Sequence, residues 1–270
     1  MAADGFLSLL AAVIPALFLV AGVYIYVALV RQINARADEP SVTPVRQFGW
    51  PEATLATVIV FVFVNGLATS AAQNVRTIQT RDLLANGLFS IVLLLFIVVF
   101  LRLRRFDLNA LGGFSKIGFG RAATTGAILL LAAYPLILLA EVVTQKLARG
   151  NLDKQAIVEL FTASSTLEQR VLIILLAVTV APLAEEFFFR FFLYGVVKRY
   201  LGRAVGIIGS ALLFAAVHAH LPSFAPLFVL GVCFAIAYEW SGSLLVSMTM
   251  HALFNALALT ALAFPEVIPQ

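Results

Sequence analysis

Long runs of apolar residues are the feature of this chain that most restricts its fold. Eight such runs, most of them about 20 residues long and bounded by charge, follow one another along the sequence. They cover residues 6–30, 52–72, 83–101, 122–143, 171–197, 204–219, 224–240 and 243–264. Backbone polar groups in lipid must be satisfied internally, which favours helices. We therefore predict an all-α, polytopic transmembrane bundle of about eight helices that forms a single domain over residues 1–270.

Composition supports a membrane protein and argues against a nucleic-acid partner. Charged residues make up 12% of the chain and hydrophobic residues 62%, whereas a soluble domain carries about 25% charged residues. The isoelectric point near 9.5 is explained by Lys and Arg in loops on the cytoplasmic side. No loop combines a basic cluster with interleaved aromatics. The single cysteine, Cys233, lies in an apolar run and is interpreted as a packing residue.

The distribution of positive charge predicts how the chain is oriented. With the N-terminus outside, 11 of the 18 Lys and Arg residues fall in inner loops and 6 in outer loops. The remaining one, Arg190, lies within a predicted span. Because positive residues are retained on the cytoplasmic side, both termini are predicted to face outward. The plasma membrane of a bacterium is the default location, since no organelle address is visible.

The longest outer loop, residues 143–170, admits two interpretations. Asp153 could cap a short helix whose apolar residues Ile157, Val158, Leu160 and Phe161 lie on the bilayer surface. Alternatively, the segment is an ordinary connecting loop with one packed turn.

The stretch AEEFFFR at residues 184–190 places three ionisable groups inside a predicted span. A charged residue at the centre of a membrane helix costs about 2.5–3.5 kcal/mol on insertion scales. Glu186 and Arg190 are four residues apart, so they share a helix face and can neutralise each other. Glu185 points about 100° away around the helix, where local pairing does not account for it. We therefore expect another helix to supply its partner.

Histidine and asparagine side chains in later spans are the candidate partners. His218 follows Phe214 by four residues in FAAVH, and His251 precedes Asn255 by four residues in HALFN. Helical spacing puts each pair on one face, and the distances from the span ends allow these groups to share one layer of the membrane with Glu185. Singly, each polar residue could merely bond a neighbouring carbonyl or fasten two helices. His220, near a span end, is assigned no role.

Together these groups predict activation of water. A carboxylate and a neutral imidazole that share a water molecule form a general-base pair, with Glu185 and His218 in these roles. His251 and Asn255 would donate hydrogen bonds to the oxyanion that forms when water adds to a peptide carbonyl. The alternative is a zinc site with Glu185, His218 and His251 as ligands and an open fourth position. The sequence leaves both open, although the familiar zinc-protease spacing of two histidines is absent.

These three motifs, in this order, resemble those of the CPBP family of CAAX-protease and bacteriocin-processing membrane endopeptidases. EEFFFR resembles its Glu-Glu-x-x-x-Arg motif, FAAVH its Phe-x-x-x-His motif and HALFN its His-x-x-x-Asn motif. The resemblance covers residues 150–264, and the first four predicted helices carry no recognised motif. Phe191 departs from the glycine that many members have after the arginine.

The resemblance implies an intramembrane endopeptidase that acts on membrane-associated or lipid-modified peptides. Glu185, His218, His251 and Asn255 would be catalytic, with Glu186, Arg190 and Phe214 supporting them. A metal-free mechanism is favoured, so no cofactor is expected, and zinc is the alternative. Two other functions remain open: a transporter or proton relay, because intramembrane carboxylates also mark ion pathways, and a catalytically silent scaffold of the same fold.

Two further local features carry predictions. The phenylalanines at 187, 188, 189, 191 and 192 cover most of the helix circumference, so they are expected to face lipid or pack, with one or two lining a substrate groove. Pro182 and Pro135 are expected to bend their helices, and Pro182 to free a carbonyl near the site.

Overall fold

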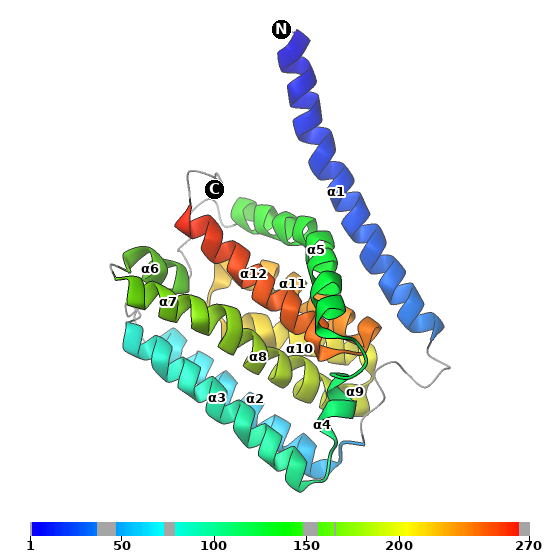
Figure 1. Cartoon of the computed structure of the whole chain (residues 1–270), viewed down its shortest axis with the longest axis vertical. Coiled ribbons are helices and arrows are strands. Elements are labelled where there is room, and N and C mark those ends of the chain that lie inside the picture. The colour runs from blue at the N-terminus through cyan, green and yellow to red at the C-terminus, as the bar shows by residue number, and fades with distance from the viewer. Residues whose placement is uncertain (1, 37–46, 73–78, 148–155, 165, 265–270) are drawn as a thin grey trace.

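A computed structural model describes residues 2–36, 47–72, 79–147, 156–164 and 166–264, and every regular element in these ranges is helical. The fold class predicted from the apolar runs is thus confirmed (Figure 1). The α-helices are α1 (Ala2–Ala35), α2 (Trp50–Ala72), α3 (Thr80–Leu103), α4 (Leu108–Gly112), α5 (Phe119–Leu147), α6 (Ala156–Ala163), α7 (Leu167–Leu175), α8 (Ala181–Glu186), α9 (Tyr194–Leu201), α10 (Arg203–Val217), α11 (Leu221–Ser241) and α12 (Leu244–Ala263). Two π-helical segments, η1 (Leu176–Val180) and η2 (Phe187–Leu193), flank α8.

Seven helical segments of the described chain are long and apolar enough to cross a membrane. One of them, Leu167–Val217, has 51 residues, which corresponds to roughly 77 Å of helix and exceeds a hydrocarbon core of about 30 Å. Gly202, with a φ of 85°, breaks this segment between α9 and α10, because glycine adopts left-handed backbone freely. Residues 167–201 and 203–217 therefore correspond to two of the eight spans predicted from the sequence.

The core of the bundle surrounds the continuous stretch from α8 to α9. Helices α10, α11 and α12 pack against η2, and α5 packs against α11 and α12. All five phenylalanines of this stretch are at most 5% exposed, so they pack inside protein and do not face lipid. Phe191, the departure from the family pattern, stacks on Phe187 with ring centroids 4.6 Å apart.

Helix α1 is held against α5 by a close approach of the two backbones. A Cβ atom at Gly22 would lie 2.4 Å from the carbonyl oxygen of Ala132, so only glycine fits here. One turn further along α1, the hydroxyl of Tyr26 donates a hydrogen bond to the carbonyl oxygen of Leu129 at 2.9 Å. Pro135 lies inside α5, which changes direction along its length as predicted (Figure 1).

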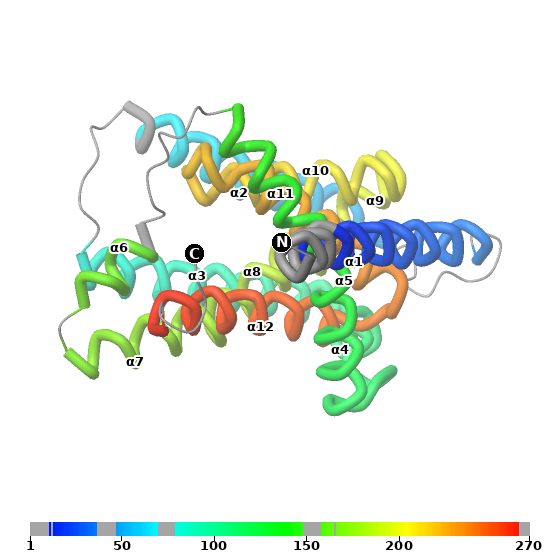
Figure 2. Tube along the Cα trace, turned by 90° about the horizontal axis from the view of Figure 1, so that it is seen from above, coloured from blue at the N-terminus to red at the C-terminus, as the bar shows by residue number. Residues whose placement is uncertain are grey.

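Helices α2 and α3 lie at the periphery, and they pack against different parts of the motif-bearing stretch. Helix α2 packs against α9 and α10, whereas α3 packs against α8 and η1. Figure 2 shows the two helices separated in the view from above. Many of their large apolar side chains are exposed, Phe61 and Leu88 among them, as is expected of helices that face lipid.

The long loop that was predicted to be outer contains α6, a helix of eight residues. Its Phe161 is buried in a small cluster with Ile173 of α7 and Leu259 of α12, so this end of the segment packs against protein and not along the bilayer surface. The predicted cap, Asp153, lies outside the described residues.

Candidate active site

Glu185 and Glu186 end the short helix α8, which lies between two π-helical segments. Isolated π-helical turns inside α-helices are rare and often mark functional sites. In η1 the backbone N–H of Ala181 bonds the carbonyl oxygen of Leu176, five residues earlier. The next donor in this pattern would be residue 182 and the next acceptor Ala177. Residue 182 is proline and has no N–H, so the Ala177 carbonyl has no donor from that position of its own helix.

Asn255 of α12 supplies the missing donor. Its Nδ2 donates to the carbonyl oxygen of Ala177 at 2.7 Å. The carbonyl that Pro182 was predicted to free is therefore that of Ala177, and it accepts a hydrogen bond from a side chain of another helix. This hydrogen bond ties α12 to the turn that precedes the two glutamates. It uses one N–H of the Asn255 carboxamide, so the predicted contact with an oxyanion stays a prediction.

Glu186 and Arg190 form a fully buried ion pair, as their spacing predicts. Arg190 Nη1 lies 3.1 Å from Glu186 Oε1, at an angle that makes the contact an ion pair and not a hydrogen bond. Arg190 Nη2 donates to the carbonyl oxygen of Gly231 at 3.5 Å. The guanidinium also lies over two rings, with Cζ 4.3 Å from the centroid of Phe214 and 5.1 Å from that of Phe234. Such desolvated cation–π contacts help to hold a buried cation.

His251 of α12 lies between the two carboxylates. Its Nδ1 is 3.1 Å from Glu186 Oε1, and its Nε2 is 3.9 Å from Glu185 Oε2. The nearer contact makes Nδ1 the hydrogen-bond donor to an ionised Glu186. The ring stacks on Phe234, with centroids 5.1 Å apart, and meets Phe214 edge-to-face. The imidazole is therefore fixed in orientation, with Nε2 directed at Glu185.

Glu185 has the partner on another helix that the sequence predicted, but the contact is too long for a hydrogen bond. Its side chain is 26% exposed, and the Oε2 atom is buried without a hydrogen-bond partner in the described part of the chain. The carboxylate lines a cavity of about 420 Å³ that reaches α2 and α3. A buried carboxylate oxygen beside a cavity is costly unless it serves binding or catalysis.

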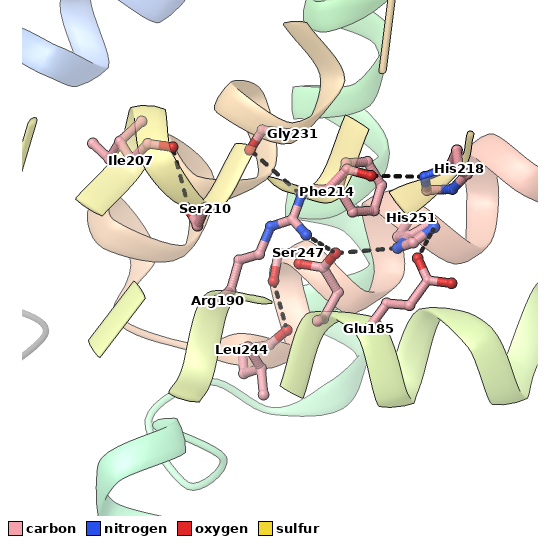
Figure 3. Close-up of polar contacts among 11 residues, drawn as sticks. Glu185, Arg190, Ile207, Ser210, Phe214, His218, Gly231, Leu244, Ser247 and His251 are labelled. Carbon is pink, nitrogen blue, oxygen red and sulfur yellow. Dashed lines mark hydrogen bonds and ion pairs between the residues drawn. The ribbon is translucent and has the colours of Figure 1, made fainter. Parts of the chain in front are cut away.

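His218 follows the last residue of α10 and points toward the same cluster (Figure 3). Its Nδ1 lies 2.7 Å from the carbonyl oxygen of Phe214 and must donate, because a carbonyl only accepts. The neutral ring then carries its lone pair on Nε2. The next residue, Ala219, has a φ of 50°, a conformation that costs a non-glycine residue about 1–2 kcal/mol. Backbone strain of this kind is concentrated at functional sites.

The structure thus brings together most of the residues predicted for the site. Figure 3 shows Glu185, Arg190, Phe214, His218 and His251 in one cluster, contributed by three stretches of chain. His220 bonds Ser223 instead, through its Nδ1 at 2.7 Å, consistent with its having no predicted role.

Sequence reasoning missed Phe234 and Gly231 of α11, which cover Arg190 and His251. An apolar run such as GVCFAIA carries no periodic signal that separates these two residues from ordinary core. It also missed the contribution of α2 and α3 to the cavity, because these helices carry no polar motif.

The zinc alternative can be compared with this geometry. Within the described ranges, no three His, Cys, Asp or Glu side chains are grouped so that they could hold a metal ion. The metal-free site stays a prediction, with Glu185, His218 and His251 as the ligands of the zinc alternative.

Comparison with known proteins agrees with the motif assignment. Residues 167–257 match a family model described as type II CAAX prenyl endopeptidase Rce1-like, and this range lies inside the predicted 150–264. Neither a curated protein nor a solved structure matches the chain significantly. The matched segment contains Glu185, Glu186, Arg190, Phe214, His218, His251 and Asn255. Over residues 167–257, this integral membrane protein is thus similar to the Rce1-like family of CAAX prenyl endopeptidases, as its motifs predicted.

Proposed function

We propose that the chain is an intramembrane endopeptidase that hydrolyses peptide bonds of membrane-associated or lipid-modified substrates. The observation that carries this proposal is the buried Oε2 atom of Glu185, which has no hydrogen bond in the described residues and faces His251 beside a cavity. The match of residues 167–257 to a prenyl endopeptidase family supports the same reaction class.

Glu185 and His218 are the groups that activate water. A water molecule in the cavity can give one proton to the Glu185 carboxylate while it donates its second hydrogen to the lone pair on His218 Nε2. The water oxygen then forms a bond to the carbonyl carbon of the substrate. When the carbon–nitrogen bond breaks, the proton held by Glu185 passes to the leaving nitrogen. No covalent intermediate with the protein is formed.

His251 stabilises the oxyanion in this mechanism. Glu185, Glu186 and Arg190 together carry a net charge of −1 when ionised, and an imidazolium at His251 makes the buried cluster neutral. With Nδ1–H held by Glu186, Nε2–H of the imidazolium is free to donate to the developing negative oxygen. Glu186 and Arg190 act by orienting His251, and Asn255 by fixing the turn that carries Glu185.

A comparison of membrane peptides tests the proposal in cells. Cells that produce the wild-type chain should contain cleaved products that are absent when Glu185→Gln is produced at the same level. A transporter predicts no cleaved product in either case and a change in solute or proton flux. A silent scaffold predicts no difference of either kind. Identical peptide profiles with equal protein levels would overturn the endopeptidase assignment.

A further inference from the structure

One end of the bundle collects most of the positive charge of the described chain. Helices α1, α3 and α9 end there, and α2, α5 and α10 begin there, toward the lower right in Figure 1. Arg104, after α3, pairs with Glu52 of α2 at 2.8 Å. Arg203 of α10 donates to Asn34 of α1 at 3.1 Å, so contacts tie these helix ends together. We call this end the arginine face, and its described cations are Arg31, Arg36, Arg102, Arg104, Arg105, Lys116, Arg121, Lys198, Arg199 and Arg203.

The acidic side chains of the arginine face are already used inside the protein. Within the described residues they are Glu52, Asp107 and Glu239. Glu52 pairs with Arg104 and also accepts from the backbone N–H of Gly49. Asp107 caps α4, and Glu239 lies in a buried cluster with two of the cations. Ten cations and three acids leave a net charge of +7 among the described side chains of this face.

The opposite end of the bundle, near α6, has no such excess among its described side chains. Its cations are Arg81, Lys146 and Arg170, and its acids are Asp82, Glu141, Glu159 and Glu168, which gives a net charge of −1. Membrane topology asks for more Lys and Arg on one side of the bilayer, but it does not ask that acidic partners be missing there. The difference between the two ends therefore favours an anionic ligand at the arginine face.

Five arginines of this face are exposed and unpaired. They make no ion pair or side-chain hydrogen bond with any residue that the structure describes, and they are Arg31, Arg102, Arg105, Arg121 and Arg199. A guanidinium presents up to five N–H donors in a planar fork that matches phosphate oxygens. The arginine face thus offers several phosphate-binding groups that the fold itself does not use.

Large apolar side chains lie directly beside these arginines. Leu103, the residue after Arg102, is 79% exposed, and Phe119, two residues before Arg121, is 74% exposed. A ligand that contacts both kinds of side chain must be anionic and apolar at adjacent points. A phospholipid with an anionic headgroup has this chemistry. A soluble acidic protein would leave the apolar side chains in water, at a cost in free energy.

Two aromatic residues place the arginine face at the level of the headgroups. Trp50 is 77% exposed, and its ring lies 5.7 Å from that of Tyr200, centroid to centroid. Tryptophan and tyrosine are enriched at the boundary between membrane and water. Arg199 precedes Tyr200, and Arg104 binds Glu52, two residues after Trp50. The cations therefore lie at the same boundary as the aromatic rings.

We propose that the arginine face binds anionic phospholipids. Their phosphate groups lie between the unpaired arginines, and their acyl chains contact Trp50, Leu103 and Phe119. None of these residues belongs to the catalytic cluster, so the inference is independent of the proposed function. It places this end of the bundle in a leaflet that contains anionic lipid.

Tryptophan fluorescence tests the proposal without any activity assay. The chain has two tryptophans, Trp50 and Trp240, which lie at the start of α2 and the end of α11, both on the arginine face. The wild-type protein is placed in vesicles of mixed phosphatidylcholine and phosphatidylglycerol, with bromine on the acyl chains of one lipid or the other. Quenching should give a relative binding constant about fivefold in favour of phosphatidylglycerol, and high salt should reduce this preference.

Two pairs of substitutions assign the preference to this face. Arg105→Gln with Arg199→Gln should lower it below about twofold. Arg81→Gln with Lys146→Gln removes the same charge from the opposite end and should leave it unchanged. Equal effects of the two pairs, or a preference that survives the first pair, would overturn the assignment. If both lipids quench the wild type alike, the proposal is wrong, and binding of soluble polyglutamate to these vesicles would then indicate an acidic protein partner.

Discussion

Two buried carboxylate clusters lie in the motif-bearing part of the molecule, and they differ in how completely their oxygens are bonded. On the side predicted to be cytoplasmic, both oxygens of Glu239 accept from Lys198 Nζ, at 2.7 and 2.9 Å, and Oε2 accepts from Tyr194 at 2.6 Å. Arg203 Nε lies 3.0 Å from Oε1. In the cluster of Glu185 and Glu186, one oxygen of each carboxylate has no hydrogen bond within the described chain.

This difference indicates a structural role for the Glu239 cluster and a catalytic role for the cluster of Glu185. A buried charge is tolerated when cations and donors surround it, as they surround Glu239, and such a network fixes helices relative to one another. A buried carboxylate oxygen without a donor lowers stability, so its retention indicates another use. Changes at Glu239 should therefore affect folding, whereas changes around Glu185 should affect cleavage.

The largest effect is expected at His218. His218→Ala removes the lone pair that orients water and should lower the rate of peptide cleavage about 10²–10⁴-fold, with the thermal unfolding midpoint little changed. His220→Ala is the matched control, because His220 is two residues away and bonds Ser223. Equal rates for the two variants would show that neither imidazole takes part in the reaction.

Substitution in the Glu239 cluster should lower the stability of the protein. Glu239→Ala leaves Lys198 buried without its carboxylate and should lower the free energy of unfolding by about 3–5 kcal/mol. Denaturation in detergent measures this, and Glu141→Ala, at an exposed acidic residue of α5, should stay within about 0.5 kcal/mol of the wild type. Cleavage per folded molecule should persist. A stable but inactive Glu239→Ala protein would place Glu239 in the chemistry and remove the contrast.

Asn255 is expected to affect both stability and cleavage, so it tests the contrast between the Glu239 cluster and the cluster of Glu185. Asn255→Ala leaves the Ala177 carbonyl without a donor and should cost about 1–3 kcal/mol of stability. Pro182→Ala restores a backbone N–H, so the double variant should lose less than the sum of the single losses. Unfolding midpoints of the four proteins measure this coupling.

Strictly additive losses would show that Asn255 does not replace the missing donor of Pro182. Cleavage by the same proteins separates the two roles of Asn255. If the double variant regains both stability and cleavage, Asn255 acts by positioning α8. If it regains stability alone, the predicted contact with the oxyanion is the better explanation.

Removal of metal is expected to have the smallest effect. Because the predicted mechanism activates water with Glu185 and His218 and needs no metal, protein treated with a chelator and shown by elemental analysis to lack zinc should keep its cleavage rate. Loss of activity that added zinc restores would support the alternative ligand set.

More of the fold than of the site could be predicted from the sequence, for physical reasons. Apolar runs indicate helices because lipid imposes internal hydrogen bonding. Gly202 divides one long helical segment at the point where the sequence predicted a boundary between two spans. The pairing of Glu186 with Arg190 followed from helical periodicity alone.

Contacts between helices that are distant in the sequence were harder to predict from the sequence. The motif spacing indicated that Glu185 needed a partner, but only the packing of α12 on α8 shows that His251 bridges both glutamates. The cavity could not be predicted, because it depends on where α2 and α3 lie and their side chains resemble those of any lipid-facing helix.

The most direct measurement is the rate of peptide cleavage by Glu185→Gln per folded molecule, taken together with its unfolding midpoint on the same preparation. Glutamine keeps the shape of the side chain but cannot accept a proton from water, so we expect a loss of at least about a hundredfold at an unchanged or higher midpoint. Cleavage at the wild-type rate by a folded Glu185→Gln protein would contradict the assignment of this carboxylate as the base.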